Sequence, residues 1–410
     1  MKRLLLVTPN LPYPPQSGSG LRAYGLLRGL KRYAPDFPLE IDLLAYHDDT
    51  VQPEATPLPD LCASITTVST PSRSKGQRLK SLFTSTQPDI ARRLESDEMR
   101  AKLTQLMTNH TYDFALYIGI ETAILMKQAR ALQPNCKQIY DAANIEHLLQ
   151  RRIAMVDRGN LKRLPASIYS QIQVGRIWRF ESAICRSADA VTAVSGEDAK
   201  TLVQFRSDNK VSVVPNGIFV EDYQKTSESL DLGKNAIIFT GKMDYRPNVD
   251  AMLWFCDEVL PRVTSEITDC KLYIVGQKPH SSLTILSDDP HIEITGWVAS
   301  VTPFLHSAGV YVTPLRMGSG TRLKLLEAMA AGCAIVSTSI GAEGLSAEAV
   351  ATMRIKDDAA GFAAAITALL RNKAEAEALS ENARLVAKEQ YDWSAIIPAL
   401  TTTLQAFSYG

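Results

Sequence analysis

The chain has 410 residues, 45% of them hydrophobic and 21% charged, which is the composition of a globular protein long enough for two domains. Its 44 basic and 44 acidic residues cancel, which excludes the overall field of a nucleic-acid-binding protein. Residues 1–200 nevertheless hold 26 basic and 20 acidic residues, a net charge of +6, so this half is the one expected to meet an anionic partner or a membrane surface.

Short apolar or β-branched runs recur along the chain between amphipathic stretches. In the first half they lie at 4–8, 41–46, 64–69, 114–119, 137–142 and 190–195. In the second half they lie at 236–242, 271–276, 292–296, 309–314 and 334–339. Apolar strands that alternate with helical patterns predict parallel sheets covered on both faces. We therefore expect an α/β fold with two doubly wound, Rossmann-like domains.

The two series of strands are separated by VSVVPNG (211–217), which marks the crossing between the domains. From about residue 358 the pattern is helical with no strand, so the last helix can return to the first domain. The expected N-terminal domain is 1–207, joined by the C-terminal helix 392–410, and the expected C-terminal domain is 208–391. Because ligands bind beyond the carboxyl ends of the strands in such sheets, the site is expected in a central cleft between the domains.

The first strand is followed by a glycine loop. Gly18 and Gly20 precede an amphipathic helix, and Gly18-x-Gly20-x-x-Ala23 imitates a dinucleotide-binding fingerprint. Ten residues separate this loop from its strand, and no acidic residue ends the second strand at the proper place, which disfavours a dehydrogenase. An ordinary turn is the alternative.

A second candidate loop, FTGKMDYRPN (239–248), follows the first strand of the second series. Lys242 and Arg246 stand at the mouth of that strand, and two cations there suit phosphate oxygens. A solvated turn is the alternative.

The third candidate, GSGTRLKLLEAMAAG (318–332), follows the strand at 309–314. Arg322 and Lys324 lie at a helix N-terminus, which disfavours cations unless an anion binds there. We expect a diphosphate on these cations and on the backbone of the glycine-rich turn, which includes Ser319, Gly320 and Thr321. Glu327 would accept hydrogen bonds from paired sugar hydroxyls. The alternative is a surface Lys324–Glu327 pair. Leu323 occupies the place of the second P-loop glycine, which excludes a Walker motif.

Five stretches resemble the donor site of retaining family-4 glycosyltransferases (glycosyl transferases group 1) of the GT-B fold. They are TGWV (295–298), TPLRMGSGTRLKLLEAMAAG (313–332), GAEGL (341–345), VVPNG (213–217) and ADAVTAVS (188–195). The resemblance covers nearly the whole chain. It implies transfer of a sugar from a nucleotide-diphosphate sugar to an acceptor hydroxyl with retention, in polysaccharide, glycolipid or glycoconjugate biosynthesis.

The resemblance also assigns roles to individual residues. Glu327 matches the ribose-binding glutamate, and the glutamate that contacts the donor sugar in the family is Ser319 here. Lys242 matches a diphosphate-binding residue, Arg246 lies near the second, and the glycine loop of Gly18 and Gly20 faces the donor phosphate and the acceptor. The backbone that binds the base corresponds to Gly296, Trp297 and Val298.

Relatives commonly read Asp-x-His-Asn-x-Glu after the strand at 137–142. Here Asp141 and Asn144 remain, as catalytic-loop candidates, but Ala143 replaces the histidine. His147 is expected to be helical and to pack or face solvent instead of substituting. In the implied mechanism the leaving diphosphate takes the acceptor proton, and the protein supplies positioning and charge.

No metal-ligand cluster appears, and cationic side chains can take a metal's role on the diphosphate, so no metal or cofactor is expected. Six cysteines without a CxxC pair, and no apolar run of membrane-spanning length, favour the cytoplasm. The acceptor is unassigned; a lipid-linked or polysaccharide hydroxyl is expected, and no nucleic acid. Basic residues that could meet a lipid phosphate or the inner membrane face, or equally well be solvated, are Arg73, Lys75, Arg78, Lys80, Arg92, Arg93, Arg151, Arg152, Lys162 and Arg163.

Two other functions remain open on this pattern. One is a nucleotide-sugar-binding protein without catalysis, which Ala143 and Ser319 suggest. The other is a nucleotide-sugar epimerase on the same fold, which would need more acid–base residues than these loops contain.

Overall fold

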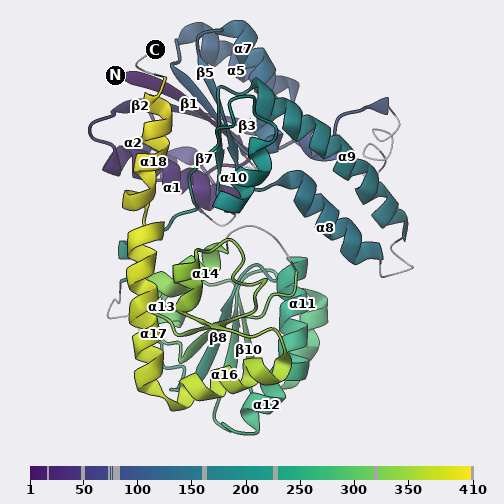
Figure 1. Ribbon diagram of the computed structural model, residues 1–410, viewed down its shortest axis with the longest axis vertical. Helices are drawn as coiled ribbons and strands as arrows, with labels where there is room; N and C mark the ends of the chain where they lie inside the picture. Colours follow the sequence, from purple (N-terminus) through teal and green to yellow (C-terminus); the bar gives the residue numbers. More distant parts are fainter. Residues whose placement is uncertain are drawn as a thin grey trace. The chain divides into compact units, whose positions relative to one another are not determined.

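A computed structural model describes residues 1–15, 18–47, 51–72, 74, 76, 84–158, 164–224, 230–317 and 322–407. The chain forms two compact units, Met1–Asn216 with Ile396–Gly410, and Gly217–Ala395 (Figure 1). The first unit thus ends inside VVPNG, where the sequence placed the boundary after residue 207. Most of the last helix, α18 (Trp393–Gln405), belongs to the first unit.

The first unit contains a parallel sheet with the strand order β3-β2-β1-β4-β5-β6-β7. Its strands are β1 (Lys2–Thr8), β2 (Leu39–His47), β3 (Ser64–Ser69), β4 (Phe114–Ile118), β5 (Lys137–Ala142), β6 (Ala190–Ala193) and β7 (Ser212–Val213). The sequence predicted the first six. The strand β7 was missed because two residues beside a proline give no apolar period.

The helices of the first unit follow its strands and cover the sheet. They are α1 (Gly18–Tyr33), η1 (Pro53–Ala55), α2 (Leu58–Leu61), α4 (Asp89–Arg92), α5 (Asp97–Asn109), α6 (Ile120–Ala123), α7 (Met126–Leu132), α8 (Glu146–Arg158), α9 (Leu164–Ser187) and α10 (Gly196–Val203). Side-chain caps begin two of them: Ser96 accepts a hydrogen bond from the Met99 amide, and Ser195 from the Asp198 amide. The helices α8 and α9 form a pair that extends away from this sheet (Figure 1).

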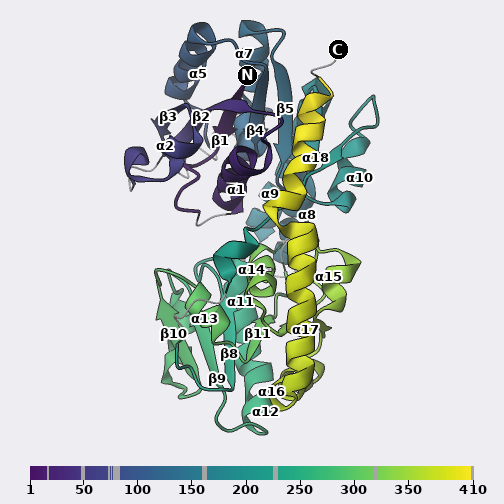
Figure 2. The ribbon, with the colours of Figure 1, turned by 90° about the vertical axis from the view of Figure 1, so that its left-hand side faces the viewer.

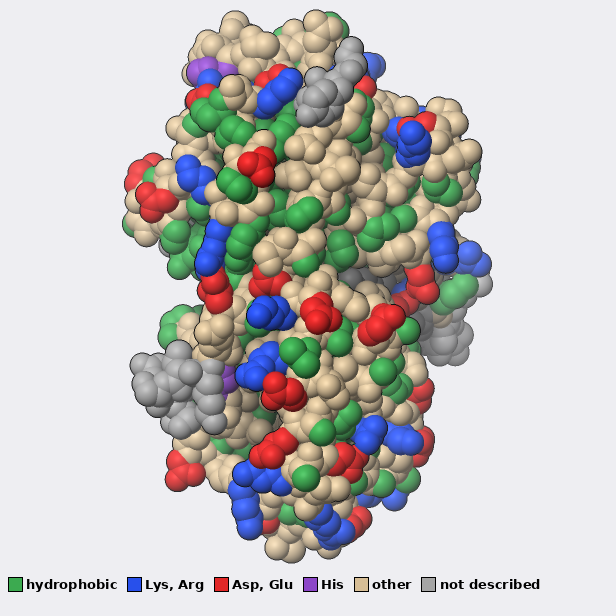
Figure 3. All heavy atoms as spheres, turned by 60° about the vertical axis from the view of Figure 1, so that its left-hand side comes forward, with side chains coloured by type: hydrophobic (Ala, Val, Ile, Leu, Met, Phe, Trp, Pro, Cys, Tyr) green, Lys and Arg blue, Asp and Glu red, His purple; other side chains and the backbone are tan. Residues whose placement is uncertain are grey.

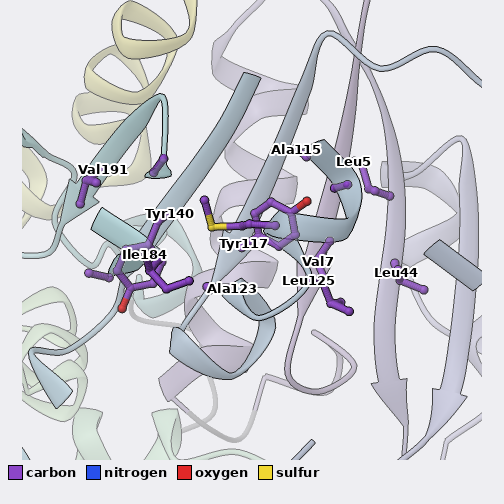
Figure 4. Packing of buried hydrophobic residues seen from close by; sticks show 14 of the residues in the cluster. Leu5, Val7, Leu44, Ala115, Tyr117, Ala123, Leu125, Tyr140, Ile184 and Val191 are labelled. Carbon is purple, nitrogen blue, oxygen red and sulfur yellow. The ribbon is translucent and has the colours of Figure 1, made fainter. Parts of the chain in front are cut away.

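The core of the first unit lies where the central strands meet these helices. Leu5 and Val7 on β1 pack with Tyr117 on β4 and Tyr140 on β5, all of them buried (Figure 4). The apolar runs of the sequence are thus interior strands.

The second unit has a parallel sheet with the order β10-β9-β8-β11-β12-β13. Its strands are β8 (Ala236–Thr240), β9 (Lys271–Val275), β10 (Ile292–Gly296), β11 (Val310–Thr313), β12 (Ile335–Ser337) and β13 (Arg354–Ile355). The two-residue strand β13 was not predicted. The helices are η3 (Val220–Tyr223), α11 (Arg246–Trp254), η4 (Phe255–Val259), α12 (Leu260–Thr264), η5 (Ser281–Asp288), α13 (Thr302–His306), α14 (Leu323–Ala331), α15 (Ala347–Ala351), α16 (Ala359–Arg371), α17 (Lys373–Val386) and η6 (Ala387–Tyr391).

Alternate residues of β8 enter two different cores. Ile237 and Phe239 pack with α11, α12 and α16, whereas Ala236 and Ile238 pack with α14 and α17. Figure 2 shows α17 running alongside this sheet. Both faces are therefore covered, which confirms the doubly wound prediction. No helix in the described part of the chain is long and apolar enough to cross a bilayer.

The strand order reverses in each sheet beside its first strand. This happens between β1 and β4 in the first unit and between β8 and β11 in the second. Connections leave such a point toward opposite faces, and the opening between them at the carboxyl ends of the strands is where α/β sheets bind ligands. In the second unit the two loops at this point are the ones with Lys242 and with Arg322.

Candidate functional site

Two glycines bring the ends of β8 and β9 into close contact. A Cβ atom on Gly276 would lie 1.7 Å from the Gly241 carbonyl oxygen, so no other residue fits there. A Cβ on Gly241 would lie 2.7 Å from Asn248 Nδ2 and 2.8 Å from Lys324 Nζ. The loop after β8 therefore lies directly against these two side chains.

Lys324 is held by groups from both sides of the point where strand order reverses. It lies on α14, which follows β11, and its Nζ donates a hydrogen bond to Asn248 Oδ1 at 2.9 Å, on the helix that follows β8. The same Nζ lies 4.1 Å from the centroid of the Phe239 ring. Asn248 in turn donates to the Lys242 carbonyl at 2.9 Å, which joins the two predicted loops. No motif in the sequence marks Asn248, because its role depends on a contact with Lys324 across 76 residues of chain.

Burial and the nearby Arg322 guanidinium lower the pKa of Lys324 to about 7. The nearby Glu327 carboxylate opposes this shift but does not offset it, and neither Asn248 nor Phe239 carries a charge that would compensate the ammonium. A second anionic group beside it would restore the charged form, and the helix N-terminus favours the same anion.

Glu327 lies one turn further along α14. Its Oε1 accepts a hydrogen bond from the Tyr223 hydroxyl at 3.1 Å, and burial raises the pKa of this carboxyl. Burial and the neighbouring Glu327 raise the pKa of Tyr223 well above its ordinary value, so the phenol remains a donor. Tyr223 orients the carboxylate, and no motif in the sequence marks it. Lys324 donates its hydrogen bond to Asn248. The alternative prediction, a surface pair of Lys324 and Glu327, therefore differs from the structure.

Arg322 is the N-cap residue of α14, and its side chain is only 10% exposed. Its guanidinium donates to the Ile340 carbonyl at 3.4 Å and lies 3.9 Å from a carboxylate oxygen of Glu343. These contacts connect α14 to the GAEGL loop, which is fixed by a bond of 2.9 Å from the Gly341 amide to Thr338 Oγ1. The predicted contributors Ser319, Gly320 and Thr321 lie outside the described residues.

The other donor-site candidates of this unit lie at the same end of its sheet. Lys242 and Arg246 are both exposed, and Arg246 opens α11. Gly296, which ends the edge strand β10, has a φ of +70°, which favours glycine. Trp297 after it is 65% exposed, and Val298 is half-buried. Each follows a strand, as the sequence predicted, but β9 separates β10 from the Lys324 group.

In the first unit, Asp141 has a different place from the one expected. It is 2% exposed, and its carboxylate accepts hydrogen bonds from Arg22 Nε at 2.5 Å and Arg22 Nη2 at 2.6 Å, and another from Thr192. The same guanidinium donates to the Val214 carbonyl and to Asn216 Oδ1, both at 3.0 Å. Asp141 therefore positions Arg22, which in turn holds the end of the first unit at Val214 and Asn216.

Gly18 and Gly20 lie at the start of α1, just before Arg22. Asn144 follows β5 and hydrogen-bonds the side chain of Glu146. Burial, with Glu121 and Glu181 nearby, raises the pKa of Glu146 to about 8, so this carboxyl carries a proton near neutral pH. The loops after β1 and after β5 thus belong to the first unit, as predicted.

His147 lies in the first turn of α8 and is buried. Its Nδ1 lies 2.5 Å from Glu181 Oε2, and its ring packs edge-on against Phe205. Glu181, on α9, also accepts a bond of 3.1 Å from the Glu146 amide. His147 is helical and packed, as expected, and ties α8 to α9.

We therefore expect His147→Ala to destabilise the fold and to leave the chemistry of each folded molecule unchanged. Removing one partner of the buried Glu181 carboxylate should lower the free energy of unfolding by about 1–3 kcal/mol. Denaturant melts and turnover per folded molecule would measure the two effects separately. A severe loss of turnover with unchanged donor binding would instead show that His147 acts in the transition state.

Comparison with known families locates the donor-site candidates of the second unit in one domain. Residues 234–372 match the family described as Glycosyl transferases group 1. These residues form a glycosyl transferases group 1 domain. The domain runs from just before β8 to the end of α16, so it contains Lys242, Lys324 and Glu327.

Known proteins resemble the chain beyond this domain. It is 31% identical over 193 residues to a phosphatidyl-myo-inositol mannosyltransferase of Mycobacterium leprae, a match that covers 45% of this chain and 50% of that protein. The chain spans about half the length of the curated relatives it matches.

Two solved structures match over the whole chain. Sucrose-phosphate synthase from Thermosynechococcus elongatus gives a TM-score of 0.73 at 16% identity and covers 100% of both chains. Anabaena HepE in complex with UDP and glucose gives 0.64 at 13% identity and covers 99% of this chain and 100% of that one. These likenesses show the fold, which is the GT-B fold of two parallel-sheet α/β domains.

Proposed function

We propose that the chain is a retaining glycosyltransferase of family 4, which moves a sugar from a nucleoside-diphosphate sugar to an acceptor hydroxyl. The main support is Lys324, a partly buried cation with a lowered pKa at the point where strand order reverses in the group 1 domain. Such a group is stabilised by a bound anion, and a diphosphate is the anion that this family's donors carry.

The proposed donor contacts use the whole carboxyl end of the second sheet. Arg322 and Lys324 bind the diphosphate, together with Lys242 and the backbone of the turn at 318–321. Glu327, held at one oxygen by Tyr223, accepts from the ribose hydroxyls through the other. The base lies on the backbone of residues 296–298, with Trp297 exposed beside it.

The proposed reaction breaks the bond from the anomeric carbon to the diphosphate oxygen and forms one from that carbon to the acceptor oxygen on the same face. The acceptor proton passes to the leaving diphosphate. The cations then stabilise the charge that develops on the leaving group. Such electrostatic stabilisation is usually the largest single contribution to catalysis. This chemistry needs no side-chain base at Ala143, and the cations take the role of a metal ion.

We propose a hydroxyl acceptor that is lipid-linked or part of a polysaccharide. The reaction is proposed to occur in the cytoplasm, which the six unpaired cysteines support. HepE was solved with UDP and glucose, and the M. leprae relative is a mannosyltransferase, so glucose and mannose donors are the first to test.

We expect the purified chain to hydrolyse one nucleoside-diphosphate sugar slowly and to transfer that sugar to an acceptor with retained anomeric configuration. Thermal stabilisation by a panel that includes UDP-glucose would find the donor. NMR of the product would give the configuration, and activity should persist in EDTA. A donor that binds without any turnover, together with turnover restored by Ala143→His, would support the silent binding protein. Loss of activity in EDTA would contradict the metal-free mechanism.

A further inference from the structure

The helical pair α8–α9 carries the charge asymmetry of the first half of the chain. Residues 146–187, from the start of α8 to the end of α9, contain eight basic and three acidic residues, a net charge of +5. Residues 1–200 as a whole also have a net charge of +6. All but one unit of this excess charge therefore lies in the hairpin, and the charges of the remaining residues in the first half nearly cancel.

Two carboxyl groups of the hairpin have described side chains, and neither places a negative charge on its surface. Glu146 carries a proton near neutral pH because its pKa is raised to about 8, and Glu181 is fully buried against His147. Arg151 and Arg152 on α8, and Arg179 and Arg186 on α9, are exposed. Figure 3 shows one face of the molecule, on which basic and acidic side chains are interspersed.

Large apolar side chains are exposed among these arginines. Met155 is 51% exposed, Ile172 41% and Trp178 46%. Trp178 contacts the Phe205 ring edge-on, at 5.7 Å between centroids, so one side of the indole is fixed and the other meets solvent. A single exposed apolar residue is ordinary, but three within one basic hairpin are not.

The exposed residues follow the helical period. On α9 they are 171, 172, 175, 178, 179, 183, 186 and 187, and on α8 they are 151, 152 and 155. Intervals of three and four residues place them on one face of each helix. Each helix thus presents a surface that mixes arginine with apolar side chains, the composition of helices that lie in the headgroup region of a bilayer.

We propose that the exposed face of the α8–α9 hairpin docks on an anionic membrane surface, with its arginines at lipid phosphates and Met155, Ile172 and Trp178 at the boundary with the acyl chains. Trp is favoured at this depth because its ring is apolar and its N–H is polar. A nucleic acid would also attract the arginines but would give no reason for exposed Ile172 and Met155. Vesicle binding is measured without donor or acceptor, so this proposal can fail while the transfer reaction stands.

The decisive experiment compares two triple variants of the full chain in cosedimentation with vesicles of phosphatidylcholine, with and without one quarter phosphatidylglycerol. One variant is Arg151→Gln, Arg152→Gln, Arg179→Gln; its matched control is Arg371→Gln, Lys373→Gln, Lys388→Gln, which removes three exposed charges from the second unit. Each arginine near an anionic surface contributes roughly a fivefold factor, so the hairpin variant should bind about a hundredfold more weakly. The control and wild type should bind alike, only to anionic vesicles, and more weakly at 0.5 M salt.

Tryptophan fluorescence provides a second readout that folding defects do not imitate. In wild type, brominated lipids should quench emission, and Trp178→Phe should abolish this quenching, whereas Trp297→Phe, at an exposed site of the second unit, should not. The proposal is overturned if wild type ignores anionic vesicles or if both triple variants bind alike. It is also overturned if the hairpin variant loses RNA binding or self-association in place of vesicle binding.

Discussion

Replacing Glu327 with glutamine should weaken nucleoside-diphosphate binding by about a hundredfold and leave the fold intact. The amide oxygen can still accept from Tyr223, so α14 keeps its contact with η3. The ribose hydroxyls would then lose charged hydrogen bonds, each worth about 1.5–3 kcal/mol. Calorimetry with the nucleoside diphosphate measures the loss, and a thermal melt checks the fold.

A ligand that lacks the ribose hydroxyls provides the control for this prediction. Wild type should bind a ribonucleoside diphosphate more tightly than its 2′,3′-dideoxy analogue, and Glu327→Gln should bind the two almost alike. Tyr223→Phe keeps the carboxylate and loses only its orienting bond, so its effect should be smaller, about three- to tenfold. If Glu327→Gln discriminates between the ligands as well as wild type does, the carboxylate does not bind ribose.

Most strands of the two sheets could be predicted from the sequence because these strands lie in the interior. A run such as AIIFT at 236–240 is apolar throughout, since alternate residues enter cores on opposite faces of the sheet. The strands β7 and β13 were missed because two residues cannot show a period. Composition signals a strand only when the strand is long enough to cross the core.

Site residues could be predicted from the sequence where their location follows from their position along a single helix or strand. Lys324 and Glu327 lie one turn apart on a helix that follows a strand, and this can be read from spacing. Asn248 and Tyr223 could not be found this way, because they act through tertiary contacts with Lys324 and Glu327 across 76 and 104 residues of chain. Asp141 shows the same limit, since its position at the end of β5 can be read from the sequence but its buried partner Arg22, 119 residues away, cannot.

Replacing Lys324 with methionine should remove most of the advantage that a nucleoside diphosphate has over the nucleoside. Methionine is unbranched like lysine and can lie against Phe239, so the packing survives while the charge is lost. A charge-assisted hydrogen bond to phosphate contributes about 1.5–3 kcal/mol, so the ratio of the two affinities should fall by roughly ten- to a hundredfold. Lys242 is exposed, so Lys242→Met should lower the ratio of the two affinities less than Lys324→Met does.

The lowered pKa gives this prediction a signature in pH. Lys324 titrates near 7 in the free protein, and a bound diphosphate stabilises its charged form and raises its pKa. Above pH 7 binding must therefore take up a proton. Between pH 7.5 and 9 the diphosphate itself is already fully ionised, so only the lysine changes its charge. The affinity for diphosphate should fall across this range, approaching a tenfold loss per pH unit. The same pKa affects folding when no ligand is bound. In the unfolded chain this lysine has its ordinary pKa of 10.5, so between pH 7 and 10.5 the unfolded chain binds more protons than the folded one. The free energy of unfolding of wild type should therefore rise with pH in that window relative to that of Lys324→Met. Calorimetry in buffers of different ionisation enthalpy counts the proton directly, and an affinity for diphosphate that is independent of pH in wild type would remove Lys324 from the diphosphate site.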